Sequence, residues 1–316
     1  MPDDFPLIGW TGTGRMGFAL AGRLLDAGIP LALYNRTRAK AEPLAARGAG
    51  AVVVHDVRQL GLCDVVFTMV AGSDDFAEVT TGSRGLLTAD ATPRVIVDCS
   101  TVGAEVSAAV RAAAAETGTA LLAAPISGNP KVVAVGRASL VVSGPEDAFR
   151  RVLPLLAALG GSVTYVGTGE AARLVKLAHN MVLAVVAQAL AESVVLAERH
   201  GVSRAAYLEF LNSSVLGSAF SRYKSPALVG LDFTPTFTTA MLRKDLDLGL
   251  AAARTAEVPM PLTAAVHQLV QAAVGAGHGG SDFAALLLEQ ARAAGLTLAP
   301  EDADVDDGLS GAGGPR

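Results

Sequence analysis

Short apolar, β-branched runs alternate with longer amphipathic segments over the first half of the chain. The short runs predict strands, and the segments between several of them carry apolar residues at helical spacing. Repeated strand–helix units of this kind indicate a parallel sheet with helices on both faces. The predicted strands are 7–10, 31–34, 51–54, 65–69, 94–98, 120–123, 139–142 and 163–166, and the predicted helices are 16–27, 38–46, 104–116 and 146–159.

The strand pattern stops after Val166, and the rest of the chain is patterned for helices. Residues 169–200 form one helical pattern, on the order of 45 Å long, which is enough to connect two domains. The sequence therefore predicts an α/β domain over 1–166 and an all-α domain over 167–298, joined by this long interdomain helix. Residues 299–316 are rich in Asp and Gly and are expected to be a disordered acidic tail. Further helices are expected near 203–213, 238–256, 261–275 and 281–295.

The composition of the 316-residue chain narrows the classes of partner. Apolar residues make up 51% and charged residues 17%, which indicates a well-buried globular protein. The net charge is −5, so there is no excess of basic residues for nucleic acid or an anionic membrane. Polar residues or glycines interrupt every apolar run, and we expect no membrane span.

The ends of the chain and its cysteines bear on location and metals. The acidic start, Met1-Pro2-Asp3-Asp4, is unlike a basic secretory signal. Cys63 and Cys99 are the two cysteines, too few for a disulfide framework, and no histidine spacing suggests a metal site. We therefore expect a cytoplasmic protein with no metal.

A glycine-rich motif follows the first predicted strand and opens the first predicted helix. Gly12 permits a tight turn, Gly14 lets a pyrophosphate approach the backbone, and Gly17 lets the helix pack close to the strand. The N-terminus of that helix then faces the phosphates. A purely structural turn is the alternative for such a motif taken alone. The motif as a whole is Gly12-Thr13-Gly14-Arg15-Met16-Gly17, and we expect its first five residues to contact a dinucleotide.

The end of the second predicted strand bears on which dinucleotide is bound. An acidic residue at this place would bind the ribose hydroxyls of NAD, but the chain has Asn35, Arg36 and Thr37. A guanidinium suits a 2′-phosphate, so we expect NADP in preference to NAD. The alternative is that Arg36 is a solvated residue at the start of a helix.

Four further segments, in order, make the chain resemble the β-hydroxyacid dehydrogenases, the group that contains 3-hydroxyisobutyrate dehydrogenase. The resemblance covers about residues 6–296 and implies a Rossmann-type doubly wound sheet followed by a helical domain. The segments are Asp98-Cys99-Ser100-Thr101, Ala124-Pro125-Ile126-Ser127-Gly128, the stretch from Gly167-Thr168-Gly169 to Lys176 and Asn180, and Lys244-Asp245, together with the Met16 variant of the glycine motif.

The resemblance implies a set of site residues around substrate and cofactor. Ser100, Ser127, Gly128 and Asn129 are expected to bind substrate, with Ser127 and Gly128 on its carboxylate. Thr101 and Lys244 are expected near the nicotinamide, and Val70 and Ala71 near the adenosine. Alternatives remain open: a plain loop turn for Ser127-Gly128, and a surface ion pair with Asp245 or Asp247 for Lys244. Ala71 stands where a proline is common.

Lys176 and Asn180 are the expected catalytic residues. Hydride transfer to or from an alcohol carbon requires a proton carrier at the oxygen. A lysine serves if burial or a nearby cation lowers its pKa. The four-residue spacing puts both side chains on one helix face. The alternatives are a surface lysine lying along an apolar helix and a buried amide that caps backbone groups. His179, between them, is expected to pack beside the site without taking part.

The stretch after Gly128 departs from the second glycine that is common in the family. Asn129-Pro130-Lys131 adds an amide and a cation near the expected acid pocket. We therefore expect a substrate with one more polar or anionic group than hydroxyisobutyrate.

Taken together, the residues predict an NADP-dependent oxidoreductase that interconverts a small β-hydroxyacid and its semialdehyde or ketoacid. An imine reductase of the same fold is one alternative, although such enzymes generally lack a lysine on the catalytic helix. A catalytically silent NADP-binding sensor is another. The apolar, Ala-rich long helix further predicts a homodimer or homotetramer.

Overall fold

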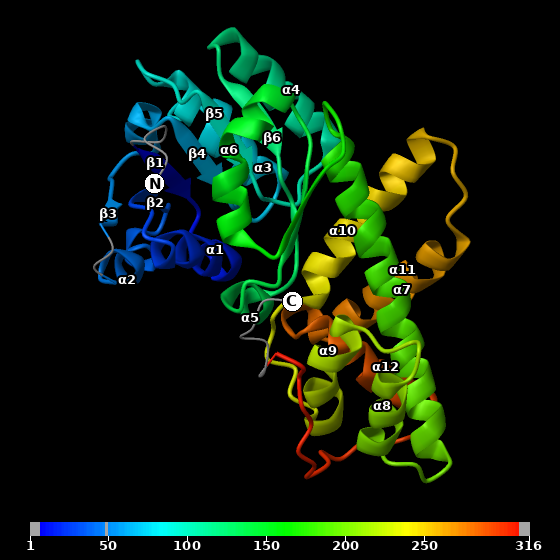
Figure 1. Ribbon diagram of the computed structural model, residues 1–316. Helices are drawn as coiled ribbons and strands as arrows, with labels where there is room; N and C mark the ends of the chain where they lie inside the picture. Colours follow the sequence, from blue (N-terminus) through cyan, green and yellow to red (C-terminus); the bar gives the residue numbers. More distant parts are fainter. Residues whose placement is uncertain (1–6, 48–49, 310–316) are drawn as a thin grey trace. The chain divides into compact units, whose positions relative to one another are not determined.

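The computed structural model describes residues 7–47 and 50–309. A six-stranded, all-parallel sheet in the order β3-β2-β1-β4-β5-β6 occupies the first half of the chain (Figure 1). The chain starts at the centre of the sheet, winds outward to β3, and then returns to build the other half, as the doubly wound prediction requires. The point where the winding reverses lies between β1 and β4, which is where such sheets bind ligands. The strands are β1 (Ile8–Thr11), β2 (Leu31–Tyr34), β3 (Val52–Val53), β4 (Val65–Thr68), β5 (Val95–Asp98) and β6 (Ala120–Ala123).

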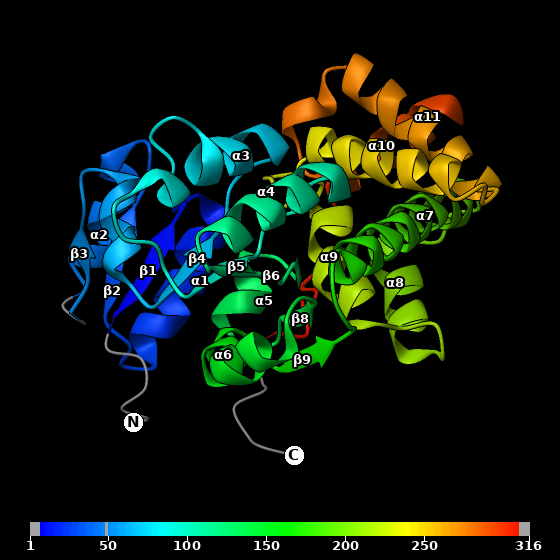
Figure 2. The same ribbon diagram turned by 90° about the horizontal axis from the view of Figure 1, so that it is seen from above.

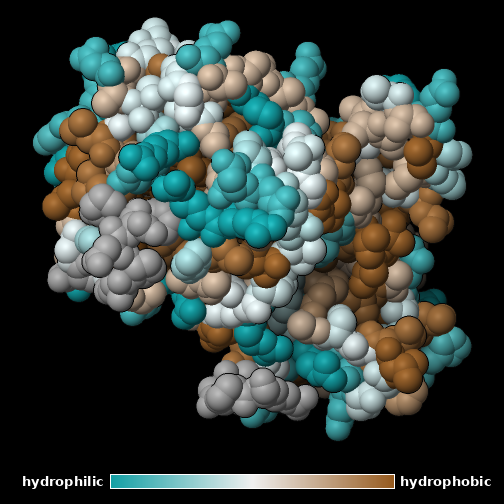
Figure 3. Space-filling view, turned by 45° about the horizontal axis from the view of Figure 1, so that its top comes forward, coloured by the Kyte–Doolittle hydropathy of each residue, from teal (hydrophilic) through white to brown (hydrophobic). Residues whose placement is uncertain are grey.

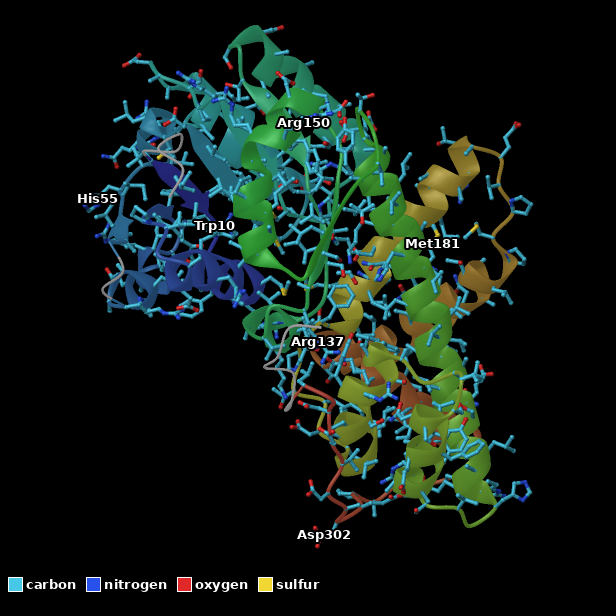
Figure 4. All side chains as sticks on the ribbon, in the orientation of Figure 1. Trp10, His55, Arg137, Arg150, Met181 and Asp302 are labelled. Carbon is cyan, nitrogen blue, oxygen red and sulfur yellow. The ribbon has the colours of Figure 1, made fainter. Side chains whose placement is uncertain are left out.

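Alternation along the strands sends side chains to two separate cores, one on each face of the sheet. Trp10 and Phe67 stack on one face with their ring centres 5.4 Å apart, while Val66 and Ile96 lie in the core on the other. Trp10 is labelled in Figure 4. Both faces are covered by helices, as expected (Figure 2). The first face carries α1 (Arg15–Asp26), α5 (Pro130–Ala134) and α6 (Glu146–Leu159); the second carries the 3₁₀-helix η2 (Val57–Leu62), α3 (Ser73–Thr81) and α4 (Ala104–Glu116).

The last strands depart from a single parallel sheet. β7 (Ile126–Ser127), β8 (Ser139–Val142) and β9 (Ser162–Tyr165) form a separate three-stranded sheet in which β7 and β8 are antiparallel. Only Ala124 and Pro125 separate β6 from β7. Two residues are too few for the crossover that another parallel strand needs, so the chain leaves the large sheet here.

The rest of the described chain is helical and has its own core. Its helices are α7 (Ala171–Arg199), α8 (Arg204–Ser213), α9 (Ala219–Gly230), α10 (Thr239–Thr255), α11 (Pro261–Gly275) and α12 (Leu286–Ala293). The pattern did not predict α9, because Pro226 lies inside it; the helix begins at a capping box in which Ser218 and Ser221 bond reciprocally. The chain divides into two compact units between Lys176 and Leu177, inside α7, whereas the expected boundary was at residue 166.

By length and composition, α7 is apolar enough to cross a membrane, although no such span was expected. Its most apolar 18-residue window has a mean hydropathy of 1.8, and half of that window is buried within the protein. Core helices of water-soluble proteins have the same character. We expected no span because single polar residues, such as Asn180 and Gln188, interrupt the apolar sequence. These residues do not lower the mean hydropathy of the helix below that of a membrane-spanning helix.

The expected disordered tail begins in an ordered segment. The Glu301 carboxylate accepts hydrogen bonds from the backbone N–H groups of Arg204 (2.7 Å) and Ala205 (3.0 Å) at the start of α8. The fully buried Arg204 guanidinium pairs with Glu198 and donates to the Ala299 carbonyl. The prediction of disorder from residue 299 is therefore wrong for residues 299–301, because the Glu301 carboxylate caps α8. Residues 310–316 and the acidic start lie outside the described residues.

Candidate active site

The glycine motif forms a tight turn between β1 and α1. Gly12 has φ +91°, and a Cβ placed on it would lie 2.1 Å from the Met69 carbonyl oxygen. A Cβ on Gly17 would lie 2.0 Å from the Gly12 carbonyl oxygen, so the first turn of the helix rests against the turn itself. A Cβ on Gly14 would meet nothing within 4 Å, and Gly14 is the N-cap of α1. The turn therefore leaves open space beside a helix N-terminus, which suits a pyrophosphate.

A pocket of about 500 Å³ opens beside this turn. Seven predicted cofactor residues line it: Gly12, Gly14, Asn35, Arg36, Thr37, Val70 and Ala71. Thr13, Arg15 and Met16 belong to the same turn but do not line the pocket. Met16 packs against the sheet core, and the Thr13 side chain is buried.

Asn35 connects the end of β2 to the glycine turn. Its Oδ1 accepts a hydrogen bond from the Thr13 N–H (2.8 Å), and its Nδ2 donates to the Thr37 carbonyl (2.8 Å). Both ends of the carboxamide are thus engaged within the protein. Asn35 shapes the rim of the pocket whether or not it touches a ligand.

Charged residues gather at the end of the pocket beside β2 and β3. The Arg36 side chain is 82% exposed and pairs with Asp75 at 2.8 Å. Lys40, His55 and Arg84 line the same pocket and were not predicted; His55 is labelled in Figure 4 at the margin of its unit. Arg58 and Arg84 hydrogen-bond the Asp56 carboxylate and hold its pKa well below the ordinary value. The spread of these residues over fifty positions hid them from motif analysis.

The segment after β5 is buried more deeply than expected. Ser100 is fully buried; its hydroxyl donates to Asp98 (2.7 Å) and accepts from the Val70 N–H (2.9 Å). Ser100 therefore connects the loops after β4 and β5, and its expected contact with substrate stays a prediction. Thr101, the next residue, is half-buried.

Asn129 likewise has a local role that the sequence did not reveal. It is buried, and its Oδ1 accepts a hydrogen bond from the Val132 N–H (3.0 Å) as the N-cap of α5. The cap occupies Oδ1 alone, and the substrate contact expected at Asn129 stays a prediction. Gly128 beside it is exposed with φ +139°, Ser127 is half-buried, and Lys131 is exposed.

Lys176 and Asn180 lie one turn apart on α7, and both are buried, at 8% and 2% exposed. Lys176 is the last residue of the first unit, and Asn180 belongs to the second. Asn180 Nδ2 donates to Asp245 Oδ2 at 2.6 Å, and its Oδ1 lies 3.0 Å from His179 Nδ1. Burial excludes the interpretation of Lys176 as a solvated surface lysine.

Asp245 is a residue that the sequence reasoning passed over. It is 1% exposed, and its other oxygen lies 3.1 Å from the ammonium of Lys244. Lys244 therefore forms the ion pair that was its alternative interpretation, and Asp245 fixes the orientation of the Asn180 amide. The Lys244-Asp245 motif could have indicated Asp245, but the expected role was given to Lys244 alone.

The cysteines and potential metal ligands add no further chemistry. Cys63 and Cys99 are buried free thiols; burial raises the pKa of Cys63 to about 11 and that of Cys99 well above its usual value. No cluster of three or more His, Cys, Asp or Glu side chains within 7–47 and 50–309 is arranged to hold a metal ion.

Family models match nearly the whole chain in two consecutive parts. Residues 7–167 match the NAD binding domain of 6-phosphogluconate dehydrogenase. Residues 167–289 match the NAD-binding domain of NADP-dependent 3-hydroxyisobutyrate dehydrogenase. The two matched parts meet at residue 167, four positions before α7 begins.

Individual proteins extend this similarity. An uncharacterized oxidoreductase of Bacillus subtilis, YfjR, is 33% identical over 87% of this chain and 96% of its own. The L-threonate dehydrogenase of Cupriavidus necator is 32% identical over 89% and 94%.

Solved structures share the fold over the same length. The 3-hydroxyisobutyrate dehydrogenase of Salmonella typhimurium is 26% identical, with a TM-score of 0.81 over 89% of this chain and 99% of that one. A structure titled Psf3 in complex with NADP+ and 2-OPP has the same identity and TM-score, over 90% of this chain and 99% of that one. An imine reductase from Pseudomonas sp., at 21% identity and a TM-score of 0.59, shares the fold.

Proposed function

Because the chain belongs to the β-hydroxyacid dehydrogenase family, we propose that it is an NADP-dependent oxidoreductase that interconverts a small β-hydroxyacid and its semialdehyde or ketoacid. One observation carries the proposal: Lys176 is buried on α7, one turn before an asparagine whose amide is fixed by a buried carboxylate. A lysine that served only to solvate the surface would not be buried one turn from a fixed amide. A nicotinamide-binding unit precedes this helix in the same chain.

Lys176 is the proposed general acid and base. The nicotinamide, when bound, supplies or accepts the hydride. In the reducing direction the Lys176 ammonium donates a proton to the carbonyl oxygen, and in the oxidising direction the neutral amine takes the proton of the hydroxyl. Burial limits competition from water for the same proton.

Asn180 is the proposed orienting residue. An ionised carboxylate only accepts hydrogen bonds, so Asp245 selects the NH₂ end of the Asn180 amide. The carbonyl end is then the acceptor, 3.0 Å from His179 Nδ1, on the helix face that Lys176 shares. A fixed acceptor suits the positioning of an ammonium or of a substrate hydroxyl.

Ser127, Gly128 and Lys131 are the proposed recognition elements for the acid. A hydroxyl and a backbone N–H suit a carboxylate, and the φ of +139° at Gly128 lets the backbone approach closely. With Asn129 used as a helix cap, the exposed Lys131 is the remaining group that favours an additional polar or anionic substituent. The similarity to an enzyme named for L-threonate, a polyhydroxy acid, agrees with this choice.

The proposed preference for NADP rests on charge at the ribose end of the pocket. Three basic residues, Arg36, Lys40 and Arg84, line the pocket together with the acidic Asp56, Asp75 and Glu78. No acidic residue follows β2 directly, where the ribose hydroxyls of NAD would be bound. The 2′-phosphate would replace Asp75 as the partner of Arg36 at little cost, since exposed ion pairs are weak.

A second copy of the chain is the proposed partner for the exposed side of α7. Val182, Val186 and Leu196 are 65%, 38% and 63% exposed, and they recur on one stripe of the helix. Figure 3 shows hydrophobic side chains at the surface of the helical unit. Light scattering should give a dimer or tetramer, and Val182→Asp should lower the mass toward that of a monomer.

The test of the function is a screen of the purified protein against short hydroxyacids and semialdehydes, followed at 340 nm with both cofactors. We expect turnover with an acid that carries an extra hydroxyl or carboxylate, and a lower KM for the phosphorylated cofactor. Turnover of imines without turnover of any hydroxyacid would overturn the proposed reaction. Higher activity with NADH than with NADPH would overturn the proposed cofactor preference.

A further inference from the structure

Arg173 is a buried guanidinium that contacts several residues of the first unit. It is 1% exposed, and its Nη2 pairs with Asp98, which is fully buried, at 2.8 Å. Nη1 donates to the Ser100 carbonyl (3.2 Å), and Nε donates to Glu170 (3.2 Å). The guanidinium also lies over the Phe76 ring, 5.5 Å from its centre. The first turn of α7 is thus tied at once to β5, to the loop after it and to α3.

Asp98 carries this attachment onward to the cofactor pocket. Besides its ion pair with Arg173, the Asp98 carboxylate accepts hydrogen bonds from the hydroxyls of Thr68 and Ser100. Ser100 in turn accepts the Val70 N–H, and Val70 lines the pocket. One carboxylate therefore joins the carboxyl ends of β4 and β5 to the start of α7.

Stability alone does not account for such a pair. Burial of two charges costs about as much desolvation free energy as their attraction returns, and apolar residues of the same size would fold as well. Arginine differs from lysine in offering five donors in a rigid plane, so it fixes direction as well as distance. The arrangement therefore indicates that the pair holds the start of α7 in a defined position.

The position that it fixes is that of Lys176. Lys176 lies three positions after Arg173, so the two side chains are neighbours on one helix face, and both residues belong to the first unit. We propose that Arg173 is a positioning residue for the reaction: by binding Asp98 it fixes the rotation of α7, and so directs the Lys176 ammonium toward the carboxyl edge of the sheet. This inference rests on the proposed function of Lys176.

The experiment compares Arg173→Lys, which keeps the charge but loses the planar donors, with the wild type. Four quantities are measured: kcat, KM, the NADPH dissociation constant, and the rate at which acetic anhydride labels Lys176, followed by mass spectrometry across pH. We expect kcat to fall at least 30-fold with KM and the NADPH constant changed less than threefold. Labelling of Lys176 at pH 9 should become at least fivefold faster, because the amine is no longer fixed.

Arg204→Lys is the matched control. Arg204 is equally buried and is paired with Glu198, but it lies at the start of α8 in the second unit. We expect a lower melting temperature with kcat and Lys176 labelling within twofold of the wild type. This separates the loss of a buried guanidinium from the loss of position at Lys176.

Glu170→Gln serves if Arg173→Lys does not fold. It removes the charge that pairs with Arg173 from the residue directly before α7, which lies nearer the surface, and should speed Lys176 labelling at least twofold. Unchanged labelling and kcat in a folded Arg173→Lys, or unchanged labelling in Glu170→Gln, would overturn the inference. Labelling needs no substrate, so it tests the position of Lys176 even if the screen finds no hydroxyacid activity and the proposed function fails.

Discussion

The two ends of the proposed cofactor and reaction site use charge in opposite ways. At the ribose end, Arg36 is 82% exposed and pairs with the partly exposed Asp75. At the other end, Arg173 and Asp98 are 1% and 0% exposed. Asp98 accepts hydrogen bonds from Thr68 at the end of β4 and from Ser100 after β5, and Arg173 donates to the Ser100 carbonyl. The exposed pair is screened by water and is worth about 0–1 kcal/mol, so a ligand can replace one of its members. The buried pair cannot open without leaving a charge unpaired, and it therefore sets geometry.

This difference predicts that changes at the buried end reduce the rate, while changes at the exposed end alter cofactor choice. The largest effect is expected for Lys176→Ala. Loss of a positioned proton carrier lowers rates by about 10²–10⁴-fold, and we expect a fall in kcat of about 10³-fold with NADPH binding intact. Steady-state kinetics and cofactor fluorescence measure the two quantities. Arg199→Ala, at the exposed end of α7, should retain wild-type kcat.

Asp245→Asn should have the next largest effect. The amide has a donor where the carboxylate had an acceptor, so Asn180 is no longer fixed in one orientation. Hydrogen bonds to charged groups contribute about 1.5–3 kcal/mol, which corresponds to roughly a 10–100-fold loss of kcat. Asp247→Asn, two residues away on an exposed carboxylate, is the control and should stay within twofold. Equal losses in both variants would count against a specific role for Asp245.

Arg36→Ala tests the exposed end. We expect the NADPH dissociation constant to rise about tenfold, or about 1.4 kcal/mol, while that of NADH changes less than twofold. Titration of cofactor fluorescence measures both. Arg38→Ala, two residues on and also exposed, should leave both constants unchanged. A similar loss for the two cofactors would show that Arg36 does not recognise the phosphate.

The smallest effect is expected at Asp56, which caps η2 and binds two arginines. Asp56→Ala should lower the free energy of unfolding of the first unit by about 1 kcal/mol at pH 7. Arg58 and Arg84 hold the pKa of Asp56 below its ordinary value, so its stabilisation is present above the unfolded pKa of about 3.9 and is lost as pH falls below it. Urea unfolding at pH 7 and pH 3 should show the difference narrowing; a constant difference would contradict this cause.

Much of the fold was predictable because local pattern and tertiary structure agree. Strand 31–34 and helices 104–116 and 146–159 coincide with β2, α4 and α6, since each apolar face meets the core that the pattern required. The helix over 219–230 was missed because Pro226 breaks the pattern, and the two-residue β7 is too short to show one.

The site was predictable where a motif fixes the backbone and less so where distant residues meet. The glycine turn has the expected form, because the steric demands on Gly12 and Gly17 are local. The pairing of Arg173 with Asp98 joins residues 75 positions apart, and no spacing in one sequence reveals it. The helix-cap contact of Asn129 was not foreseen, because a helix cap and a substrate ligand call for the same side chain.

The most direct measurement of the central claim is the single-turnover rate of hydride transfer in Lys176→Ala, followed at 340 nm with the best acid from the screen, with and without added methylamine. The account predicts transfer about 10³-fold slower than in the wild type despite bound NADPH, and partial recovery when the amine is added. Transfer at the wild-type rate in the absence of any amine would contradict it.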